Sequence, residues 1–359
     1  KDKIDFSASL AKINGKKAEL KTQEEAQKAY DACQGNFIVS NIKSTTRKRE
    51  ARPPFITSTL QQEASTKLSF SAKRTMSIAQ RLYEGVDVGN GQEGLITYMR
   101  TDSTRLSDVY VNGARELIQN EYGKQYLGTY HVSNDANSQD AHEAIRPTSL
   151  ANTPEKLKPH LTSEQYKLYA LIYARALSSL MSAAKYDSLT LTLSQNGYDF
   201  TASGSTMKFD GYLKVYGEYE SGKDVVLPSF EEQEQIAAKE LKANQHFTEP
   251  PARYTEAKLI KALEEDGIGR PSTYAMIIDT IQARGYVTLE KTSESSRTKV
   301  FKPTEQGILT TEKLDEFFQD IINVRYTAKM ESTLDEIADG TAEEVATLKD
   351  FYNRFQPLL

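Results

Sequence analysis

Hydrophobic positions change their spacing several times along the chain, and each change predicts a change of secondary structure. Residues 1–52 combine short alternating segments with a helical spacing around residues 22–32. The Pro53-Pro54 pair then interrupts the pattern, and residues 59–83 carry apolar side chains at helical spacing with a break near residues 69–71. We therefore expect a small α/β segment followed by a mainly helical region.

The helical region is expected to extend to about residue 185. Residues 95–99 read as a strand, and Ser107 has the character of an N-cap for a helix through residue 120. A further helix is predicted over residues 164–184. The apolar, strand-like run at 95–99 would place Tyr98 shortly before a helix start.

β-structure is predicted again after residue 185, because residues 189–193 alternate strictly between apolar and polar. Residues 198–202 and 211–219 continue in the same style. Pro250-Pro251 marks the next boundary, after which helices dominate, with a β-hairpin between residues 286 and 302. The pattern thus predicts a multidomain α+β chain, with β-rich segments at 1–52 and 186–250 and helical segments at 53–185 and 251–359.

Length and composition limit the classes of protein that remain. The 359 residues suffice for two or three domains, and no apolar run approaches the roughly 20 residues of a membrane span. Cys33 is the single cysteine, which excludes a disulfide framework and a cysteine-based zinc finger and is typical of a reducing compartment. We expect it to be a buried structural thiol. Because the chain starts at Lys1, we also expect residues upstream of it.

Basic residues cluster before the first proline pair although the net charge of the chain is −5. Five cations stand close to a single acid, Glu50: Lys43, Arg47, Lys48, Arg49 and Arg52. Local patches rather than net charge decide nucleic-acid binding, because fields are screened over about 8 Å at physiological salt. A solvated linker explains the cluster equally well, and both interpretations stay open.

The most informative short segment places Tyr98 two residues before Arg100, at the end of an apolar run. A tyrosine hydroxyl has an ordinary pKa of about 10, so a tyrosine nucleophile needs a nearby cation to favour the phenolate. Arg100 could supply this charge beside a phosphate. The alternative is that Tyr98 is one of 20 tyrosines and only packs its ring.

A second candidate segment carries His142 and Arg146. An arginine binds phosphate oxygens in a bidentate manner and a histidine can donate a hydrogen bond or a proton, so the pair suits a phosphodiester. A solvent-exposed histidine is the alternative. The adjacent Glu143 does not make a metal motif, because no second histidine follows at helical spacing.

The third candidate is a helix-turn-helix over residues 255–287, followed by β-structure. Thr255 is expected to cap the first helix and Pro271 to occupy the first position of the second, where Arg270, Ser272 and Thr273 would meet an anion. An ordinary helical hairpin is the alternative.

Gln80 and Arg81 could likewise line a nucleic-acid path or merely solvate a helix. Neither a phosphate-binding glycine loop nor an Asp-x-Asp pair occurs, so this chain is not expected to use ATP or to bind its own metal ion.

Five sequence blocks, in this order, resemble the type IA DNA topoisomerases, specifically the bacterial topoisomerase I branch. They are PFITSTLQQ at 54–62, AQRLYE at 79–84, ITYMRTDS at 96–103, AHEAIRP at 141–147 and GIGRPSTY at 267–274. The resemblance implies that Tyr98 attacks a backbone phosphate of single-stranded DNA, forms a 5′-phosphotyrosyl intermediate and later reseals the strand after strand passage. Negatively supercoiled DNA would be relaxed without ATP.

The same resemblance implies roles for the other candidates. Arg100 and His142 would act on the phosphate at the catalytic centre, and the remaining candidates would contact or orient DNA: Gln80, Arg81, Asp102, Arg146, Arg270, Ser272 and Thr273. It further implies a β-rich arch, a helical domain bearing the tyrosine and a helical DNA-binding domain in a toroid. A monomer in the bacterial cytoplasm, associated with the nucleoid, would fit the family.

The sequence departs from the family pattern at its start, where these enzymes carry a Toprim domain with an acidic magnesium site. The carboxyl-terminal DNA-binding region of the family is also not matched. We therefore expect Mg²⁺ to be bound by the missing Toprim domain, and these residues alone not to relax DNA. A winged-helix DNA-binding protein without catalysis is the alternative function, and a purely structural clamp is a third.

Overall fold

The computed structural model describes residues 4–89, 91–130, 142–220, 222 and 224–358, so Ala141 of the histidine segment lies outside the described residues. The chain forms two compact units. Unit 1 comprises residues 1–51, 122–129 and 181–250, and unit 2 comprises residues 52–121, 130–180 and 251–359. Each unit is therefore built from three separate stretches of the chain, and helices and antiparallel strands together confirm the predicted α+β class.

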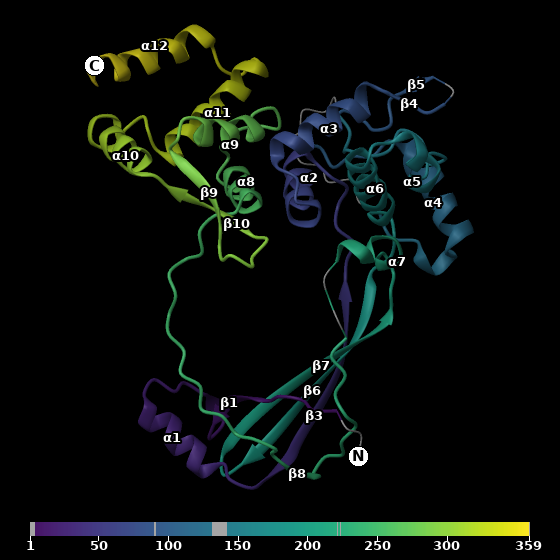
Figure 1. Cartoon of the computed structure of the whole chain (residues 1–359), viewed down its shortest axis with the longest axis vertical. Coiled ribbons are helices and arrows are strands. Elements are labelled where there is room, and N and C mark those ends of the chain that lie inside the picture. The colour runs from purple at the N-terminus through teal and green to yellow at the C-terminus, as the bar shows by residue number, and fades with distance from the viewer. Residues whose placement is uncertain (1–3, 90, 131–141, 221, 223, 359) are drawn as a thin grey trace. The chain divides into compact units, whose positions relative to one another are not determined.

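Unit 1 is built on a six-stranded antiparallel sheet with strand order β2-β1-β7-β6-β3-β8. Its strands are β1 (Ser9–Ile13), β2 (Lys16–Lys17), β3 (Asn36–Arg49), β6 (Ala184–Gln195), β7 (Tyr198–Phe209) and β8 (Gln235–Ala237). Figure 1 shows the long strands β3, β6 and β7 side by side. Asn196 and Gly197 join β6 to β7 with φ of 49° and 82°, the left-handed pair that a tight hairpin requires. This turn fixes which side chains of the two strands lie opposite each other.

One end of the sheet carries helix α1 (Gln23–Ala32), which begins with a capping box between Thr22 and Glu25. Cys33 follows the helix and packs with Phe37, Val39 and Leu193 in a hydrophobic cluster. Its side chain is buried, which confirms the expected structural thiol.

The structure decides against one open alternative and corrects one expectation for this unit. Residues 43–49 of the basic cluster lie in β3, so the linker alternative does not hold for them, because this segment pairs with β6 as far as Arg49 opposite Ala184. Residues 211–219 are not a strand but helix α7 (Leu213–Tyr216) and a 3-10 turn (Gly217–Tyr219). Tyr212 and Tyr216 stand four residues apart and are both 1% exposed, so burial here follows the helical period.

Unit 2 contains helices from both helical stretches of the sequence. The first stretch forms α2 (Thr57–Glu63), a π-helix (Ala64–Leu68), α3 (Ala72–Glu84), α4 (Asp108–Glu121), α5 (Pro154–Leu157) and α6 (Ser163–Ser178). Short strands β4 (Val86–Asp87) and β5 (Gln92–Glu93) and two 3-10 turns (Lys124–Tyr126, in unit 1, and Lys158–His160) complete the region. The expected break near residue 70 is confirmed, with Ser69 left-handed at φ 60° and Ser71 capping α3. The helix predicted to residue 184 ends at Ser178, because Ala184 already enters β6.

The last stretch forms α8 (Glu256–Glu265), α9 (Tyr274–Ala283), β9 (Val287–Lys291), β10 (Lys299–Pro303), α10 (Glu305–Phe318), α11 (Val324–Ala338), α12 (Glu344–Phe355) and a final 3-10 turn (Gln356–Leu358). The Thr255 cap and the hairpin are confirmed. Helix α9 begins at Tyr274 and not at Pro271, because a tight turn precedes it in which the Thr273 hydroxyl accepts a 2.8 Å bond from the Arg270 amide.

A hydrophobic cluster joins α3 of the first stretch to this last one. Ala72 packs there with Ile260, Tyr274, Ile278 and Phe301. Among the described residues, no helix is long and apolar enough to cross a membrane.

Candidate active site

Tyr98 lies on an irregular segment and not on the strand that was predicted for residues 95–99. Its apolar neighbours Leu95, Ile96 and Met99 are buried, but Ile96 forms only an isolated bridge with Pro147. The apolar run therefore reflects burial of a loop, which a short hydrophobic pattern does not distinguish from a strand. Tyr98 itself is half-buried.

Thr97 fixes one side of this segment. Its hydroxyl donates to the Ala144 carbonyl at 2.7 Å and accepts from the Arg146 amide at 3.0 Å, while its own amide donates to the Arg146 carbonyl at 2.9 Å. These bonds attach the tyrosine segment to the residues that follow His142. The two candidate segments, far apart in the sequence, are thereby held together.

Thr57, at the start of α2, fixes the other side. Its buried hydroxyl donates to the Met99 carbonyl at 2.7 Å and accepts from the Thr101 amide at 2.9 Å. The Thr57 amide also donates to the Thr101 carbonyl at 2.9 Å. Because buried backbone groups need partners, these bonds hold the backbone on both sides of Tyr98 and Arg100 in one conformation.

A cavity of about 490 Å³ opens beside Tyr98. Its walls come from α3 and from the tyrosine segment: Met76, Ser77, Gln80, Tyr98, Met99 and Arg100. The predicted residues Gln80, Tyr98 and Arg100 thus meet around one space. Its volume is in the range of ligand sites, and polar and cationic groups face it.

Two rings contact the tyrosine ring. The His142 imidazole lies 5.4 Å from it, centroid to centroid, at 32°, and the Tyr83 ring lies 5.3 Å from it at 65°. His142 is therefore brought to the site as predicted, although the two residues are 44 positions apart in the sequence (98 and 142). The contact made by Tyr83 was missed. Tyr83 stands in the AQRLYE block, so the signal was present but carried no specific role.

Arg100 is exposed, and its guanidinium has no ion-pair partner in the part of the chain that the structure describes. An unpaired guanidinium on the wall of an open cavity can receive an anionic group, and its planar donors match two oxygens of a phosphate. The charge expected beside Tyr98 is thus available at the cavity.

Arg146 differs from Arg100, because its side chain is only 12% exposed and fully engaged. It donates to Glu143 at 2.7 Å, to the Pro147 carbonyl at 2.9 Å and to the Ser107 hydroxyl at 3.2 Å, and it lies over the Tyr110 ring. Burial tends to raise the pKa of the Glu143 carboxyl, but the hydrogen bond and charge of Arg146 outweigh it and leave this pKa lowered. Arg146 therefore orients the histidine segment from within the protein.

Comparison with known proteins identifies the group to which the chain belongs. A family model described as DNA topoisomerase matches residues 3–349. The full-length topoisomerase I from Thermotoga maritima is similar in structure, with a TM-score of 0.84 and 37% sequence identity over 98% of this chain. The chain belongs to the type IA DNA topoisomerase family. It spans 56% of the length of the Thermotoga protein.

The remaining predicted residues of this type IA topoisomerase chain lie outside the Tyr98 cavity. Arg81 is exposed on α3, and its charge contributes to the lowered pKa of Glu164 after the larger effects of Arg74. Asp102 is also exposed. Burial raises the pKa of Tyr274 to about 12, and the negative charges of Glu264 and Asp102 add to the rise. Asp102 thus acts electrostatically on the start of α9.

The turn before α9 holds the last three predicted residues. Arg270 donates to Asp335 at 2.6 Å and lies 3.8 Å from Glu331, both on α11. Ser272 is exposed, and the hydroxyl of Thr273 is bonded within the turn. Within the part of the chain that the structure describes, the turn therefore presents one hydroxyl without a partner, that of Ser272, and a guanidinium that already has carboxylate partners.

Proposed function

We propose that the chain carries the catalytic tyrosine of a type IA topoisomerase, and that Tyr98 is this residue. The observation that supports the proposal most strongly is the shared cavity of Tyr98, Arg100 and Gln80, with the His142 ring against the tyrosine.

In the proposed reaction the Tyr98 oxygen loses its proton and attacks a phosphorus of single-stranded DNA. A P–O bond to the tyrosine forms, the P–O3′ bond breaks, and the 3′ oxygen leaves with a proton as a hydroxyl. The 5′-phosphotyrosyl bond is again a phosphodiester, so the 3′-hydroxyl can reverse the step without ATP. Between the two steps another strand passes through the break, which relaxes negative supercoils.

Arg100 and His142 would stabilise the charge that grows on the attacked phosphate, because fixed donors beside developing charge contribute most to such reactions. Gln80 would hold the DNA strand at the cavity wall. Arg81, Asp102, Arg270, Ser272 and Thr273 would bind or orient DNA outside it, and Arg146 would orient His142. The protein would act as a monomer on DNA in the bacterial cytoplasm.

Magnesium would be supplied by the Toprim domain that the family resemblance implies. Among the residues described here, no group of three or more His, Cys, Asp or Glu side chains is placed to hold a metal ion. The residues present therefore do not fit this ion, and no step is assigned to it in this chain. We accordingly propose that the 359 residues alone do not relax supercoiled plasmid.

The alternative of a winged-helix DNA-binding protein has some structural support, since α8, α9 and the β9–β10 hairpin follow one another. The family match extends from residue 3 to residue 349, however, and includes this region in the topoisomerase. A preference for one duplex sequence would favour the alternative.

The test mixes the chain with end-labelled single-stranded DNA and Mg²⁺, with and without a separately produced Toprim domain. We expect a denaturant-resistant protein–DNA adduct only when the Toprim domain is present. Relaxation of supercoiled plasmid by the chain alone would contradict the proposed division of labour. Absence of adduct in every mixture, together with sequence-specific duplex binding, would favour the non-catalytic function.

A further inference from the structure

A second cavity, of about 380 Å³, lies on the sheet of unit 1 and is not part of the Tyr98 site. It is lined by β3, β6 and β7 and by the segment that pairs with β7 through Val225 and Ser205. Its lining includes three cations of the basic cluster at residues 43–49 and no carboxylate. The topoisomerase chemistry proposed above uses none of these residues.

Strand register explains why the polar groups meet on one face of the sheet. Arg47 is opposite Tyr186, and Ser188 is opposite Ser205 on the next strand. Side chains opposite each other share a face, and alternate residues along a strand share it too. Thr190 and Ser203, which are also opposite each other, therefore extend the same row of hydroxyl groups.

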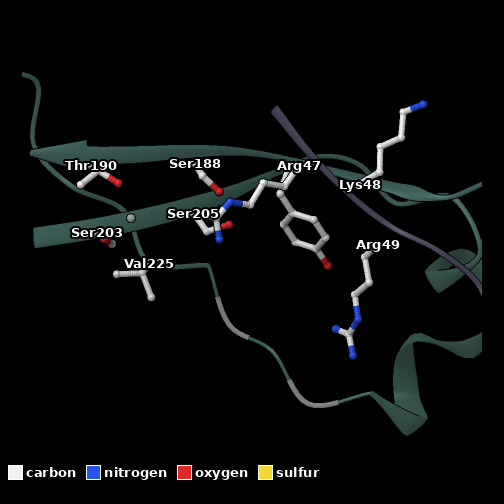
Figure 2. Close-up of a pocket in the computed structure, with 10 residues that line it drawn as sticks. Arg47, Lys48, Arg49, Ser188, Thr190, Ser203, Ser205 and Val225 are labelled. Atoms are coloured by element: carbon white, nitrogen blue, oxygen red, sulfur yellow. The ribbon is translucent and has the colours of Figure 1, made fainter. Parts of the chain in front are cut away.

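Figure 2 shows the Arg47 side chain directed over this row, close to Ser188 and Ser205, whereas Lys48 points away. Ser188 is only 9% exposed. Its hydroxyl has no hydrogen-bond partner within the described part of the chain, and Arg47 has no ion-pair partner there. The Ser188 oxygen is not one of the buried unpartnered atoms of the described residues, so it reaches the cavity and is available to donate to a ligand there.

Arg49, two residues further along β3, is already occupied. It forms an ion pair with Glu220. Burial tends to lower the pKa of the Arg49 guanidinium, but the charges of Tyr212 and Glu220 outweigh it and leave this pKa raised. Arg47 is thus directed over the cavity without an ion pair among the described residues, and Arg49 is a fixed charge beside it.

We propose that this cavity binds a phosphodiester group of DNA, through the Arg47 guanidinium and the Ser188 and Ser205 hydroxyls. Arginine donates to two phosphate oxygens at once, and serine hydroxyls are frequent donors to DNA phosphates. The identity of the anion as DNA rests on the proposed function. The site gives unit 1 a hold on the DNA backbone that reads no base sequence.

The test measures equilibrium binding of a fluorescein-labelled oligonucleotide by anisotropy, between 50 and 200 mM salt. All proteins carry Tyr98→Phe, so that covalent chemistry cannot contribute. A 20-nucleotide single strand and a 20-base-pair duplex form separate arms, and inorganic phosphate at matched ionic strength forms a third. Arg47→Gln and Ser188→Ala are compared with Lys48→Gln, which removes the same charge from the adjacent residue that points away.

We expect Arg47→Gln to weaken DNA binding by about tenfold, the effect of one lost hydrogen bond to a charged group. The slope of log K against log salt should become shallower by about 0.7 for the single strand or about 0.9 for the duplex. Ser188→Ala should weaken binding by about threefold without changing the slope. Lys48→Gln should have less than half of the Arg47→Gln effect on both quantities.

Equal effects of Arg47→Gln and Lys48→Gln would overturn the proposal, because they would reflect net charge alone. An Arg47 dependence seen with inorganic phosphate but with neither DNA would assign the cavity to a free anion and also overturn it. The wild-type chain serves separately for the adduct test. If Arg47→Gln weakens DNA binding but the wild-type chain forms no adduct in any mixture, the phosphodiester site is supported and the proposed chemistry is refuted. If the adduct forms but Arg47→Gln binds DNA like the parent protein, the chemistry is supported and this site is refuted.

Discussion

The Thr97 hydroxyl donates a 2.7 Å hydrogen bond to the Ala144 carbonyl oxygen, and this bond attaches the tyrosine segment to the histidine segment. Tyr98 follows Thr97 directly, and His142 precedes Ala144 by two residues. The ring contact between Tyr98 and His142 thus depends on a backbone connection made by neither of them. Thr97 thus positions the adjacent Tyr98, to which the proposed chemistry is assigned.

Replacing this hydroxyl should loosen the site. Thr97→Val leaves the Ala144 carbonyl and the Arg146 amide without their partner, at a cost of about 1–3 kcal/mol in the free energy of unfolding. Thr97→Ser keeps the hydroxyl and should stay close to wild type. Urea denaturation compares the three proteins. A Thr97→Val protein as stable as Thr97→Ser would show that these bonds do not hold the segments together.

Close packing beneath Tyr83 gives a second prediction. A Cβ at Gly94 would lie 2.6 Å from the Tyr83 carbonyl oxygen, so the backbone must move. Gly94→Ala should destabilise the protein by about 1–3 kcal/mol and reduce adduct formation by displacing the Tyr83 ring from Tyr98. At Gly113 on α4 a Cβ meets only the Leu150 Cδ1, at 3.4 Å. Gly113→Ala is the control, and equal melting temperatures for both variants would contradict the prediction.

Many of the helices and strands could be predicted from the sequence. Where the prediction failed, the failure has a physical reason. Periodicity located α3 after the break near residues 69–71, the predicted caps Ser107 and Thr255 located the starts of α4 and α8, and the β9–β10 hairpin lies where it was expected. Residues 95–99 were misread because burial of a loop produces the same apolar run as a buried strand. Residues 211–219 were misread because three tyrosines with alternating neighbours hide a four-residue spacing.

The candidate site was likewise predictable in part. Sequence blocks indicated Tyr98, Arg100, Gln80 and His142, and the structure places all four together or in ring contact. Nothing local in the sequence shows that Arg146 is internally paired while Arg100 is free, because this depends on Glu143 and Ser107 being close in space. Likewise, the row of hydroxyls beneath Arg47 requires the register of three strands.

Glu256 provides a prediction for pH. Burial raises the pKa of its carboxyl, against the opposing effect of a 2.6 Å hydrogen bond from the Ala72 amide. Because the folded pKa is above the unfolded one, its contribution to stability is complete below the unfolded pKa and is lost as pH rises through the folded value. Glu256→Gln should therefore melt higher than wild type at pH 8 and lose this advantage toward pH 4.

Melting followed by circular dichroism between pH 4 and pH 8 checks this difference. Glu265→Gln on the same helix is the control, since Glu265 is exposed and its ion pair among the described residues is with Lys261. The difference in melting temperature between Glu265→Gln and wild type should not grow with pH. A Glu256→Gln protein that becomes less stable relative to wild type as pH rises would contradict the raised pKa of Glu256.

Arg100 should act on the rate of adduct formation and not on folding. Arg100→Gln removes the free guanidinium from the cavity wall, and loss of one fixed donor to a developing anion costs about 10²–10³ in rate. Lys167→Gln removes one positive charge from an exposed position on α6 outside the cavity. Quench-flow measures the rate of adduct formation for both variants, each mixed with the Toprim domain and single-stranded DNA. Equal rates for both variants would mean that Arg100 is not at the reacting phosphate.

Mass spectrometry of the adduct tests the central claim most directly. The trapped protein–DNA complex is digested with nuclease and trypsin, and the peptide that retains a nucleotide is sequenced. We predict a 5′-phosphate on the Tyr98 hydroxyl in the wild-type protein and no adduct with Tyr98→Phe, whose ring still packs against Tyr83 and His142. A nucleotide on any other residue, or an undiminished adduct with Tyr98→Phe, would contradict the account.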